Sequence, residues 1–174
     1  SMKILVASDK FKGSLTAAEA CEAIAAGLRE GLTGDGHEIR CLPIADGGDG
    51  IAETLTAAAN GEWIEVNVTG PLGDRITAGY GLIEKGKTAV IEMANASGLA
   101  LLGDREKDPL RASTFGTGEL ILDAISRGAS EILLGIGGSA TNDGGIGMAL
   151  ALGHHFFDAA DCELTALPEA LGEV

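Results

Sequence analysis

Residues 132–147 read ILLGIGGSATNDGGIG, and the rest of the chain is organised around this stretch. The apolar or small residues 132–136 predict a buried strand, and the apolar pattern from Ile146 predicts a helix. A glycine-rich loop with hydroxyl, amide and carboxylate side chains joins them. In a parallel sheet such a loop lies at the carboxyl end of its strand, where main-chain N–H groups and the next helix N-terminus attract anions. We therefore expect this loop to bind phosphate.

The residue types in the loop suit that ligand. The glycines can adopt positive φ angles and let a phosphate oxygen approach the main chain, while the polar side chains add donors. Asp143 is expected either to cap the following helix or to lie near a metal ion. The candidate phosphate contacts are Gly137, Gly138, Ser139, Thr141 and Asn142. The structural alternative is a turn that only lets the helix pack close to the sheet, but the crowding of polar side chains favours phosphate.

Two known phosphate-binding patterns were compared with the loop. The P-loop pattern is absent because no lysine follows a suitably spaced glycine. The dinucleotide pattern G-x-G-x-x-[GA] matches at Gly135, Gly137 and Ala140, and Asp158 stands where an acidic ribose ligand is required. Against it, Gly144 and Gly145 would fall inside the helix that this pattern needs, each costing about 1 kcal/mol relative to alanine. A nicotinamide-dependent oxidoreductase is therefore kept as an alternative.

Composition excludes several classes of partner. A formal net charge of −14 disfavours nucleic acid and anionic membranes, which require clustered lysine and arginine. A phosphate ligand must then arrive with Mg²⁺ or meet a local cationic pocket. Cys21, Cys41 and Cys162 form no metal or disulfide pattern, and no apolar run is long enough to span a membrane. These features predict a cytoplasmic protein that acts on small molecules.

The first part of the chain predicts alternating strands and helices. Residues 3–7 and 38–44 are apolar strand candidates, a capping box at Thr16 and Glu19 opens the helix between them, and a second helix is expected over 51–59. This order predicts a parallel, doubly wound unit. Its two loops lie at the same edge of the sheet and carry the polar residues Asp9, Lys12, Asp46 and Asp49.

From residue 62 the pattern changes. Apolar and polar residues alternate to about residue 93, with turn-formers between the runs, which predicts antiparallel hairpins and a domain boundary near Gly70. A helix is expected to open at residues 113–118, where Thr114 and Thr117 offer a second anion site. Residues 154–158 are compatible with a last strand.

These residue types favour phosphoryl transfer. The sequence has no G-x-S-x-G elbow and no histidine in a catalytic context, which disfavours acyl transfer. Phosphoryl transfer instead requires a phosphate cradle, Mg²⁺ on carboxylates, a cation and a base near the acceptor hydroxyl. The loops supply each of these groups. The structural alternative for residues 46–49 is a turn in which Asp49 caps the helix.

Several segments, in this order and spacing, resemble the bacterial glycerate kinase family. They are SDKFKGSLTA (8–17), PIADGGDG (43–50), VTGPLGD (68–74), IEMANASGL (91–99), FGTGELIL (115–122) and GIGGSATNDGG (135–145). The resemblance implies an ATP- and Mg²⁺-dependent enzyme that phosphorylates D-glycerate, with the 2-phosphate as the expected product. It covers the chain as far as Asp158, and because the family's chains are longer, a fragment of this length is expected to be inactive by itself.

The resemblance also implies a two-domain fold with the active site in the cleft between the domains. On that basis residues 1–70 are expected to begin a discontinuous, Rossmann-like domain, and residues 71–174 to form part of a second α/β domain. The alternative to an enzyme is a module that binds a phospholigand without turnover.

The site residues are carried over position by position. Catalysis is assigned to Asp46, as the general base, with Lys12 and Asp49. Substrate contacts are expected from Asp9, Lys12, Ser97, Thr114 and Lys107, nucleotide contacts from Gly116, Thr117, Gly137, Gly138, Ser139, Thr141 and Asn142, and metal contacts from Asp49 and Asp143. Lys107 stands where the family usually has an arginine, and its point charge weakens the expectation that a bidentate guanidinium fork holds the glycerate carboxylate.

Overall fold

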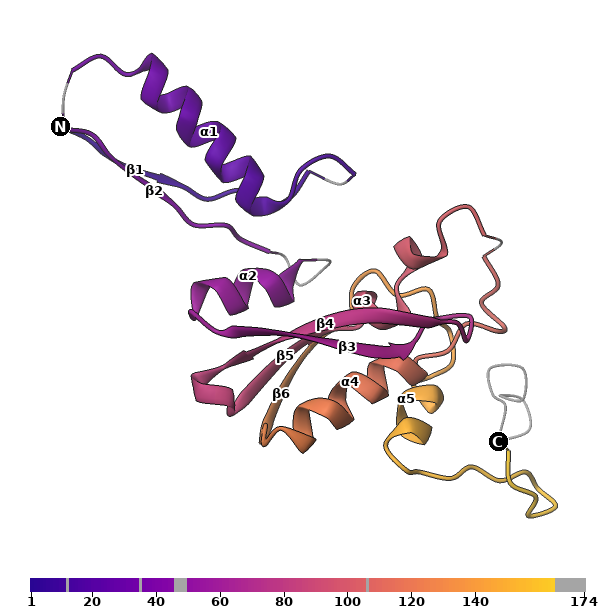
Figure 1. The fold of residues 1–174 in the computed structure, drawn as a ribbon. Helices are drawn as coiled ribbons and strands as arrows, with labels where there is room; N and C mark the ends of the chain where they lie inside the picture. Colours follow the sequence, from indigo (N-terminus) through magenta and orange to yellow (C-terminus); the bar gives the residue numbers. More distant parts are fainter. Residues whose placement is uncertain (12, 35, 46–49, 106, 165–174) are drawn as a thin grey trace.

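The computed structural model describes residues 1–11, 13–34, 36–45, 50–105 and 107–164. It confirms a mixed α/β fold with parallel and antiparallel strands (Figure 1). The strands are β1 Lys3–Val6, β2 Glu38–Cys41, β3 Glu62–Thr69, β4 Arg75–Ile83, β5 Thr88–Glu92 and β6 Glu131–Gly135. The α-helices are α1 Ala17–Gly31, α2 Ile51–Ala58, α3 Ala94–Ser97, α4 Phe115–Ser126 and α5 Ile146–Ala151, and 3-10 helices cover Glu84–Gly86 and Leu99–Leu102. None of the helices in these ranges is long and apolar enough to cross a membrane.

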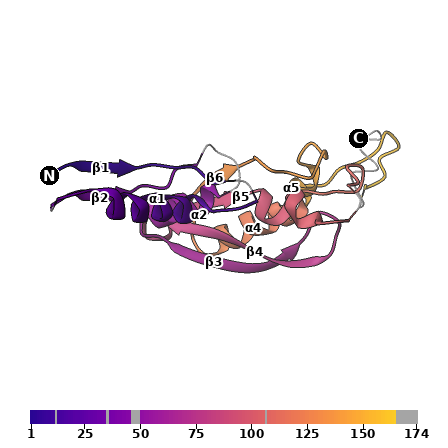
Figure 2. The same cartoon turned by 90° about the horizontal axis from the view of Figure 1, so that it is seen from above.

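β1, α1 and β2 form an N-terminal unit (residues 3–41) that extends from one side of the molecule (Figures 1 and 2). β1 and β2 pair in parallel, from Lys3 opposite Glu38 to Val6 opposite Cys41. A parallel pair needs a crossover connection, and α1 supplies it. The predicted parallel strand–helix–strand order is confirmed.

Local sequence explains the limits of these elements. The capping box at the start of α1 is confirmed: the Glu19 N–H donates to the Thr16 hydroxyl at 3.2 Å, and the Glu19 carboxylate accepts from the Thr16 N–H at 2.8 Å. β2 ends at Cys41, earlier than the predicted residue 44. Main-chain hydrogen bonds nevertheless continue past this point, because the N–H groups of Leu42 and Ile44 donate to the Val6 and Ser8 carbonyls at 2.8 and 3.1 Å.

The larger part of the chain is a sheet unit (residues 51–151) built on a four-stranded sheet with strand order β3-β4-β5-β6. β3, β4 and β5 are antiparallel neighbours, which confirms the predicted hairpins, and β6 pairs in parallel with β5. The glycine-rich loop therefore leaves β6 at the edge of the sheet where β5 also ends. This is the placement that the strand–loop–helix pattern predicts.

α4 covers one face of this sheet and forms the main core with it (Figure 1). Alternate residues of β4 point toward α4, as expected for a strand with one apolar face. The buried side chains at this contact include Ala78, Tyr80, Leu82, Leu120, Ile121 and Ala124.

α2 lies on the opposite face of the same sheet and not on the β1–β2 pair (Figure 1). The expected doubly wound arrangement therefore does not extend to this helix. The reason is the close approach of α2 to β4 at Gly81, where an added Cβ atom would lie 1.6 Å from the Thr56 Oγ1 atom of α2. The absence of a side chain at Gly81 thus allows the buried face of α2, Ala52 and Thr56, to pack directly on the strand.

The predicted strand at 154–158 is wrong. Only Phe157 is paired there, in an isolated bridge with Glu163. The Asp158 carboxylate accepts hydrogen bonds from the N–H groups of Ala160 and Cys162, both at 2.8 Å. These bonds stabilise a chain reversal in place of an extended strand.

The predicted domain boundary near Gly70 falls in the turn between β3 and β4. These strands pair along their length, from Glu62 opposite Leu82 to Thr69 opposite Arg75. The assignment of residues 1–70 to a discontinuous Rossmann-like domain, and of residues 71–174 to a second domain, stays a prediction about a longer protein.

Tyr80→Phe is expected to lower the free energy of unfolding by about 1 kcal/mol. The Tyr80 side chain is buried and its hydroxyl donates to Asp123 Oδ2 at 2.8 Å, while Arg127 donates to the same oxygen at 2.8 Å. Burial, and then the bond to Asp123, raises the pKa of Tyr80, so the hydroxyl remains a donor. Urea denaturation of both proteins measures the loss, and an unchanged midpoint would contradict it.

Glu119→Gln is expected to destabilise the chain by about 1 kcal/mol at neutral pH and by less in acid. Burial raises the pKa of Glu119, but hydrogen bonds from the Thr69 N–H and from Arg75 outweigh it, and the net pKa is lowered. This stabilisation is present above the unfolded-state pKa of about 4.3 and is lost as the pH falls through the lower folded-state pKa. Denaturation at several pH values should show the gap to wild type closing below about pH 4.

The control is Glu22→Gln, which removes an exposed carboxylate 3.8 Å from Arg29. A loosely paired surface charge should change stability by no more than about 0.5 kcal/mol. A gap for Glu119→Gln that stays constant with pH would contradict the assigned cause.

Candidate functional site

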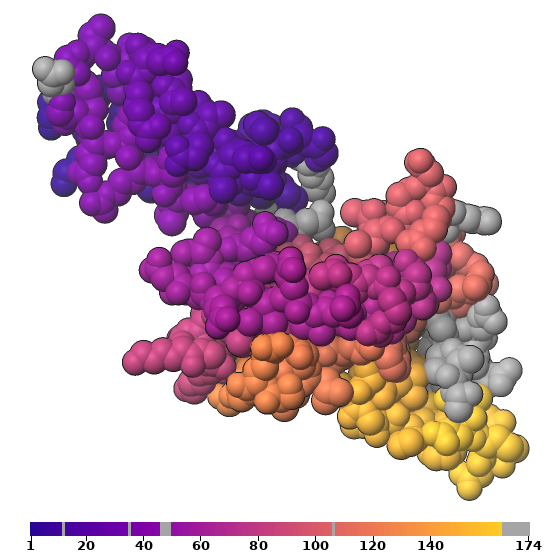
Figure 3. Space-filling model, in the orientation of Figure 1, coloured from indigo at the N-terminus to yellow at the C-terminus, as the bar shows by residue number. Residues whose placement is uncertain are grey.

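A cavity of about 1340 Å³ lies where the N-terminal unit meets the sheet unit. Its wall is formed by the segment after β1, the start of α1, the end of β2 and the segment after it, by α2 and the sheet, and by the segments that follow β5 and β6. In the space-filling view the N-terminal unit stands out from the rest of the molecule, so the cavity lies between two distinct masses (Figure 3). Such junctions are common places for ligand sites.

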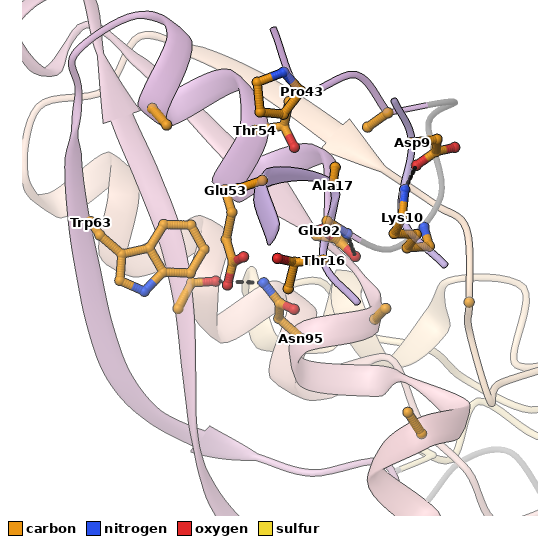
Figure 4. Close-up of a pocket in the computed structure, with 18 of the residues that line it drawn as sticks. Asp9, Lys10, Thr16, Ala17, Pro43, Glu53, Thr54, Trp63, Glu92 and Asn95 are labelled. Carbon is orange, nitrogen blue, oxygen red and sulfur yellow. Dashed lines mark hydrogen bonds between the residues drawn. The ribbon is translucent and has the colours of Figure 1, made fainter. Parts of the chain in front are cut away.

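The structure brings some of the predicted site residues together on this wall. Asp9, Lys107 and Gly138 line the cavity, although they come from widely separated segments. Asp9 follows β1, and its Oδ1 atom accepts a hydrogen bond of 2.7 Å from the Lys10 N–H, which fixes the carboxylate at the strand end (Figure 4). Gly138 has a φ of 73°, which a residue with a Cβ rarely adopts.

The glycine-rich loop is held by main-chain hydrogen bonds to residues 97–99. The Leu99 N–H donates to the Gly138 carbonyl at 2.8 Å, and the Ala140 N–H donates to the Ser97 carbonyl at 2.9 Å. The Ser139 and Thr141 hydroxyls are 2.7 Å apart and hydrogen-bond to each other. Gly138 thus reaches the cavity wall, while Gly137, Ser139, Thr141 and Asn142 do not line it. Their contact with phosphate stays a prediction.

The predicted hydroxyls of Ser97, at the end of α3, and of Thr114 and Thr117, at the start of α4, are buried and do not line the cavity. Ser97 Oγ and Thr117 Oγ1 are 2.8 Å apart and hydrogen-bond to each other, and both residues are 0% exposed. Gly116 lies against β3, where an added Cβ would be 1.8 Å from the Thr69 carbonyl oxygen. Thr114 is buried as well. These side chains pack the helix against the sheet, and their predicted roles as ligand contacts remain untested.

Asp143 joins the starts of two helices. Its Oδ2 atom accepts from the Thr114 N–H and hydroxyl, both at 2.8 Å, and from the Gly147 N–H at 3.1 Å. Its Oδ1 atom accepts from the Gly145 N–H at 3.0 Å. The carboxylate therefore satisfies main-chain donors at the first turn of α5, the capping function that was one of two expectations for it. Its role as a metal ligand stays a prediction.

Lys12, Asp46 and Asp49 lie outside the described residues. Within the described ranges, no group of three or more histidine, cysteine, aspartate or glutamate side chains is arranged to hold a metal ion. The assignment of Asp46, Lys12 and Asp49 to catalysis, and of Asp49 to metal binding, therefore stays a prediction.

Sequence reasoning missed a buried acid on the cavity wall. Glu92 is 2% exposed, and its two carboxylate oxygens accept from the Gly50 N–H at 2.8 and 2.9 Å. Gly50 is the N-cap of α2, with a φ of 94°, and as a glycine it has no side chain to cap the helix. Glu92 supplies the acceptor in its place. The signal was an acid at the end of the apolar run TAVIE (88–92), at the same sheet edge as the loop after β6.

Other missed residues also line this cavity (Figure 4). They are Lys10, Thr16, Glu53, Trp63 and Asn95. In the sequence they look like ordinary loop, helix-cap or surface residues of helices and strands. Only the meeting of the two units brings them together.

The described cysteine on the cavity wall is not suited to act as a covalent nucleophile. Cys41 is the cysteine that lines the cavity. Burial, and next the nearby Glu22 carboxylate, raises the pKa of its thiol. A neutral thiol is a poor nucleophile, so direct transfer between bound ligands suits this site better than a thiol intermediate.

The sequence profile described as the Glycerate kinase family matches residues 4–174. The chain belongs to this family. It is 50% identical over 163 residues to the glycerate kinase of Bacillus subtilis (strain 168), and 49% identical over 163 residues to the glycerate 2-kinase of Escherichia coli (strain K12). Each alignment covers 94% of this chain and 42% of the relative. The chain thus spans less than half the length of these relatives.

A solved structure has the same fold over this region. The crystal structure of putative glycerate kinase 2 from Salmonella typhimurium LT2 superposes with a TM-score of 0.79 at 45% identity. The match covers 96% of this chain and 44% of that one. The family resemblance and the mixed α/β fold expected from sequence are both confirmed.

In this member of the glycerate kinase family, the cavity wall carries both positive and negative side chains. The chain as a whole carries −14, yet Lys10 and Lys107 both reach this cavity. They bring positive charge to a cavity that Gly138 also lines, which suits an anion. Carboxylates of Asp9, Glu53 and Glu92 line the remaining wall, so the cavity combines cationic and acidic parts.

Proposed function

We propose that this chain forms the ligand-binding cavity of an ATP-dependent kinase that phosphorylates D-glycerate, with 2-phosphoglycerate as the product. One observation carries the proposal: in a chain of the glycerate kinase family, Asp9, Lys107 and Gly138 meet on the wall of a single cavity. The E. coli relative is a glycerate 2-kinase by name, which supports the choice of product. We include a cytoplasmic location, because the cysteines form no disulfide pattern.

In this reaction a hydroxyl oxygen of glycerate forms a bond to the γ-phosphorus of ATP. The bond from that phosphorus to the oxygen bridging to the β-phosphate breaks, ADP leaves, and a base accepts the hydroxyl proton. We propose Asp46 as that base. Lys12 and Lys107 are proposed to neutralise phosphate or the glycerate carboxylate, and the main chain at Gly138 is proposed to contact phosphate.

Mg²⁺ is proposed to enter with ATP and to offset the charge of the phosphate oxygens. It needs few protein ligands, usually one or two carboxylates together with phosphate oxygens and water. The Asp9 carboxylate on the cavity wall fits that demand. Asp49 is the metal ligand that we propose from the sequence. Among the described residues, Asp9 offers a carboxylate of the type that this role requires.

A coupled assay of ADP release with D-glycerate and ATP tests the proposal. It should be run on this chain and on a longer chain that contains it, with enolase added to detect the 2-phosphate. We expect glycerate-dependent ADP release by the longer chain and an enolase-competent product. ADP release that does not depend on glycerate, or binding of NADH in place of ATP, would contradict the proposal. Binding of both ligands without turnover would indicate a non-catalytic module.

A further inference from the structure

The cavity is larger than a three-carbon acid requires. Pockets for small ligands usually have volumes of about 300–1000 Å³, whereas this one measures about 1340 Å³. The charged groups discussed above occupy only part of its wall. Trp63 and small residues of α2 and β4, namely Ala57, Ala58, Thr77 and Gly79, also line the cavity. They have no role in the proposed chemistry so far.

Trp63 provides a flat wall there. Trp63 is a residue of β3, pairs with Gly81 of β4, and is 37% exposed. A Cβ atom built on Gly79 would lie 2.5–2.6 Å from three adjacent ring atoms, Cζ2, Nε1 and Cε2. The main chain of Gly79 therefore packs closely against the Nε1–Cε2–Cζ2 side of the indole, where a β-carbon would not fit. The indole also lines the cavity.

Polar groups stand beside the indole (Figure 4). The Asn95 amide donates to the Gly79 carbonyl at 3.0 Å, which fixes the side chain on the same strand segment that supports the ring. Glu53 of α2 adds a carboxylate, an acceptor for amino groups, on this side of the cavity. Lys10 and Asp9 lie on the opposite side of the view from Trp63 (Figure 4).

The two sides therefore suit different parts of one ligand. Glu53 brings a carboxylate near Trp63, which disfavours phosphate there, whereas the ammonium group of Lys10 lies beside the Asp9 carboxylate on the other side and offsets its charge (Figure 4). A nucleobase has a π-face that stacks on aromatic side chains, and an adenine amino group is a donor for a carboxylate. We infer that the adenine ring of the nucleotide stacks on Trp63, with its amino group toward Glu53. This inference rests on the proposed function and adds the position and orientation of ATP.

Calorimetric titration with Mg²⁺·ATP and with Mg²⁺·tripolyphosphate, on the wild-type protein and on Trp63 variants, tests the inference. Loss of base–aromatic stacking should weaken ATP binding about 5- to 150-fold in Trp63→Ala. Trp63→Phe keeps an aromatic face and should stay within about threefold of wild type. Tripolyphosphate has no base, so its affinity should be the same in all three proteins.

The matched control is Phe157→Ala, an exposed aromatic residue outside the cavity wall, which should leave ATP affinity unchanged. A measurement without variants uses Trp63 as the single tryptophan of the chain. ATP should quench or shift its fluorescence, and tripolyphosphate should not.

The outcomes separate this inference from the proposed function. Unchanged ATP affinity in Trp63→Ala, together with glycerate-dependent ADP release, would overturn the position of the base and leave the kinase intact. Absence of ATP binding by the wild-type protein would overturn both. ATP binding that depends on Trp63 without any turnover would support the base site and contradict the kinase.

Discussion

Replacing Asp143 with alanine is expected to lower the free energy of unfolding by about 3–5 kcal/mol. The residue is 1% exposed, and its carboxylate accepts hydrogen bonds from Thr114, Gly145 and Gly147 at the starts of α4 and α5. Alanine leaves these buried donors without an acceptor, at about 1–3 kcal/mol for each unsatisfied group. Chemical denaturation followed by circular dichroism measures the loss.

Two further variants make this result specific. Asp143→Asn keeps one acceptor oxygen and should lose less stability than alanine, because one amide oxygen can still receive the donors of Thr114. Asn142→Ala changes the exposed neighbour in the same loop and should stay within about 0.5 kcal/mol of wild type. If Asp143→Ala were as stable as wild type, the carboxylate could not be the link between the two helix starts.

Asp46→Asn is expected to lower turnover of the longer chain by about 10²- to 10⁴-fold, the usual range for a lost general base. Asparagine has nearly the shape of aspartate but cannot accept the proton of the glycerate hydroxyl. The expected pattern is a lower kcat with a small change in KM, because binding is retained. Steady-state ADP release at saturating ATP and glycerate measures it.

The control for Asp46→Asn is Asp161→Asn, the same chemical change at an exposed turn. Asp161 has a φ of 64°, and asparagine tolerates this conformation well. The control should keep wild-type turnover. A near-normal rate in Asp46→Asn would assign the base to another group, with Asp49 as the next candidate.

Local sequence signals predicted most of the elements because they act over a few residues. The Thr16–Glu19 capping box marks the start of α1, and the alternating pattern from residue 62 gives the antiparallel strands. Gly128, with a φ of 100°, closes α4 as expected for a C-cap glycine. The strand, loop and helix around residues 132–147 form as predicted, with β6 over 131–135 and α5 from Ile146.

Contacts between distant segments could not be predicted in this way. The position of α2 depends on Gly81 meeting Thr56 across the sheet face, and neither residue signals the other in sequence. The hydroxyls of Ser97 and Thr117 illustrate a second limit. A hydroxyl near a helix end looks the same in sequence whether it binds a ligand or a residue of its own chain, and here the two hydroxyls bind each other.

The candidate site was partly predictable for the same reason. Asp9 and Gly138 stand directly after strands, where polar residues and glycine are conspicuous, and both line the cavity. Trp63 and Glu92 were missed because an aromatic residue and an acid within strands look like ordinary surface or core positions. Their importance appears only when α2, β3 and β5 are brought to one cavity.

The most direct test of the account is a crystal structure of the longer chain with Mg²⁺, a non-hydrolysable ATP analogue and D-glycerate. We predict density for both ligands in the cavity lined by Asp9, Glu92, Lys107 and Gly138, with phosphates toward Gly138. Ligand density on another face of the molecule, with this cavity holding only solvent, would contradict the account.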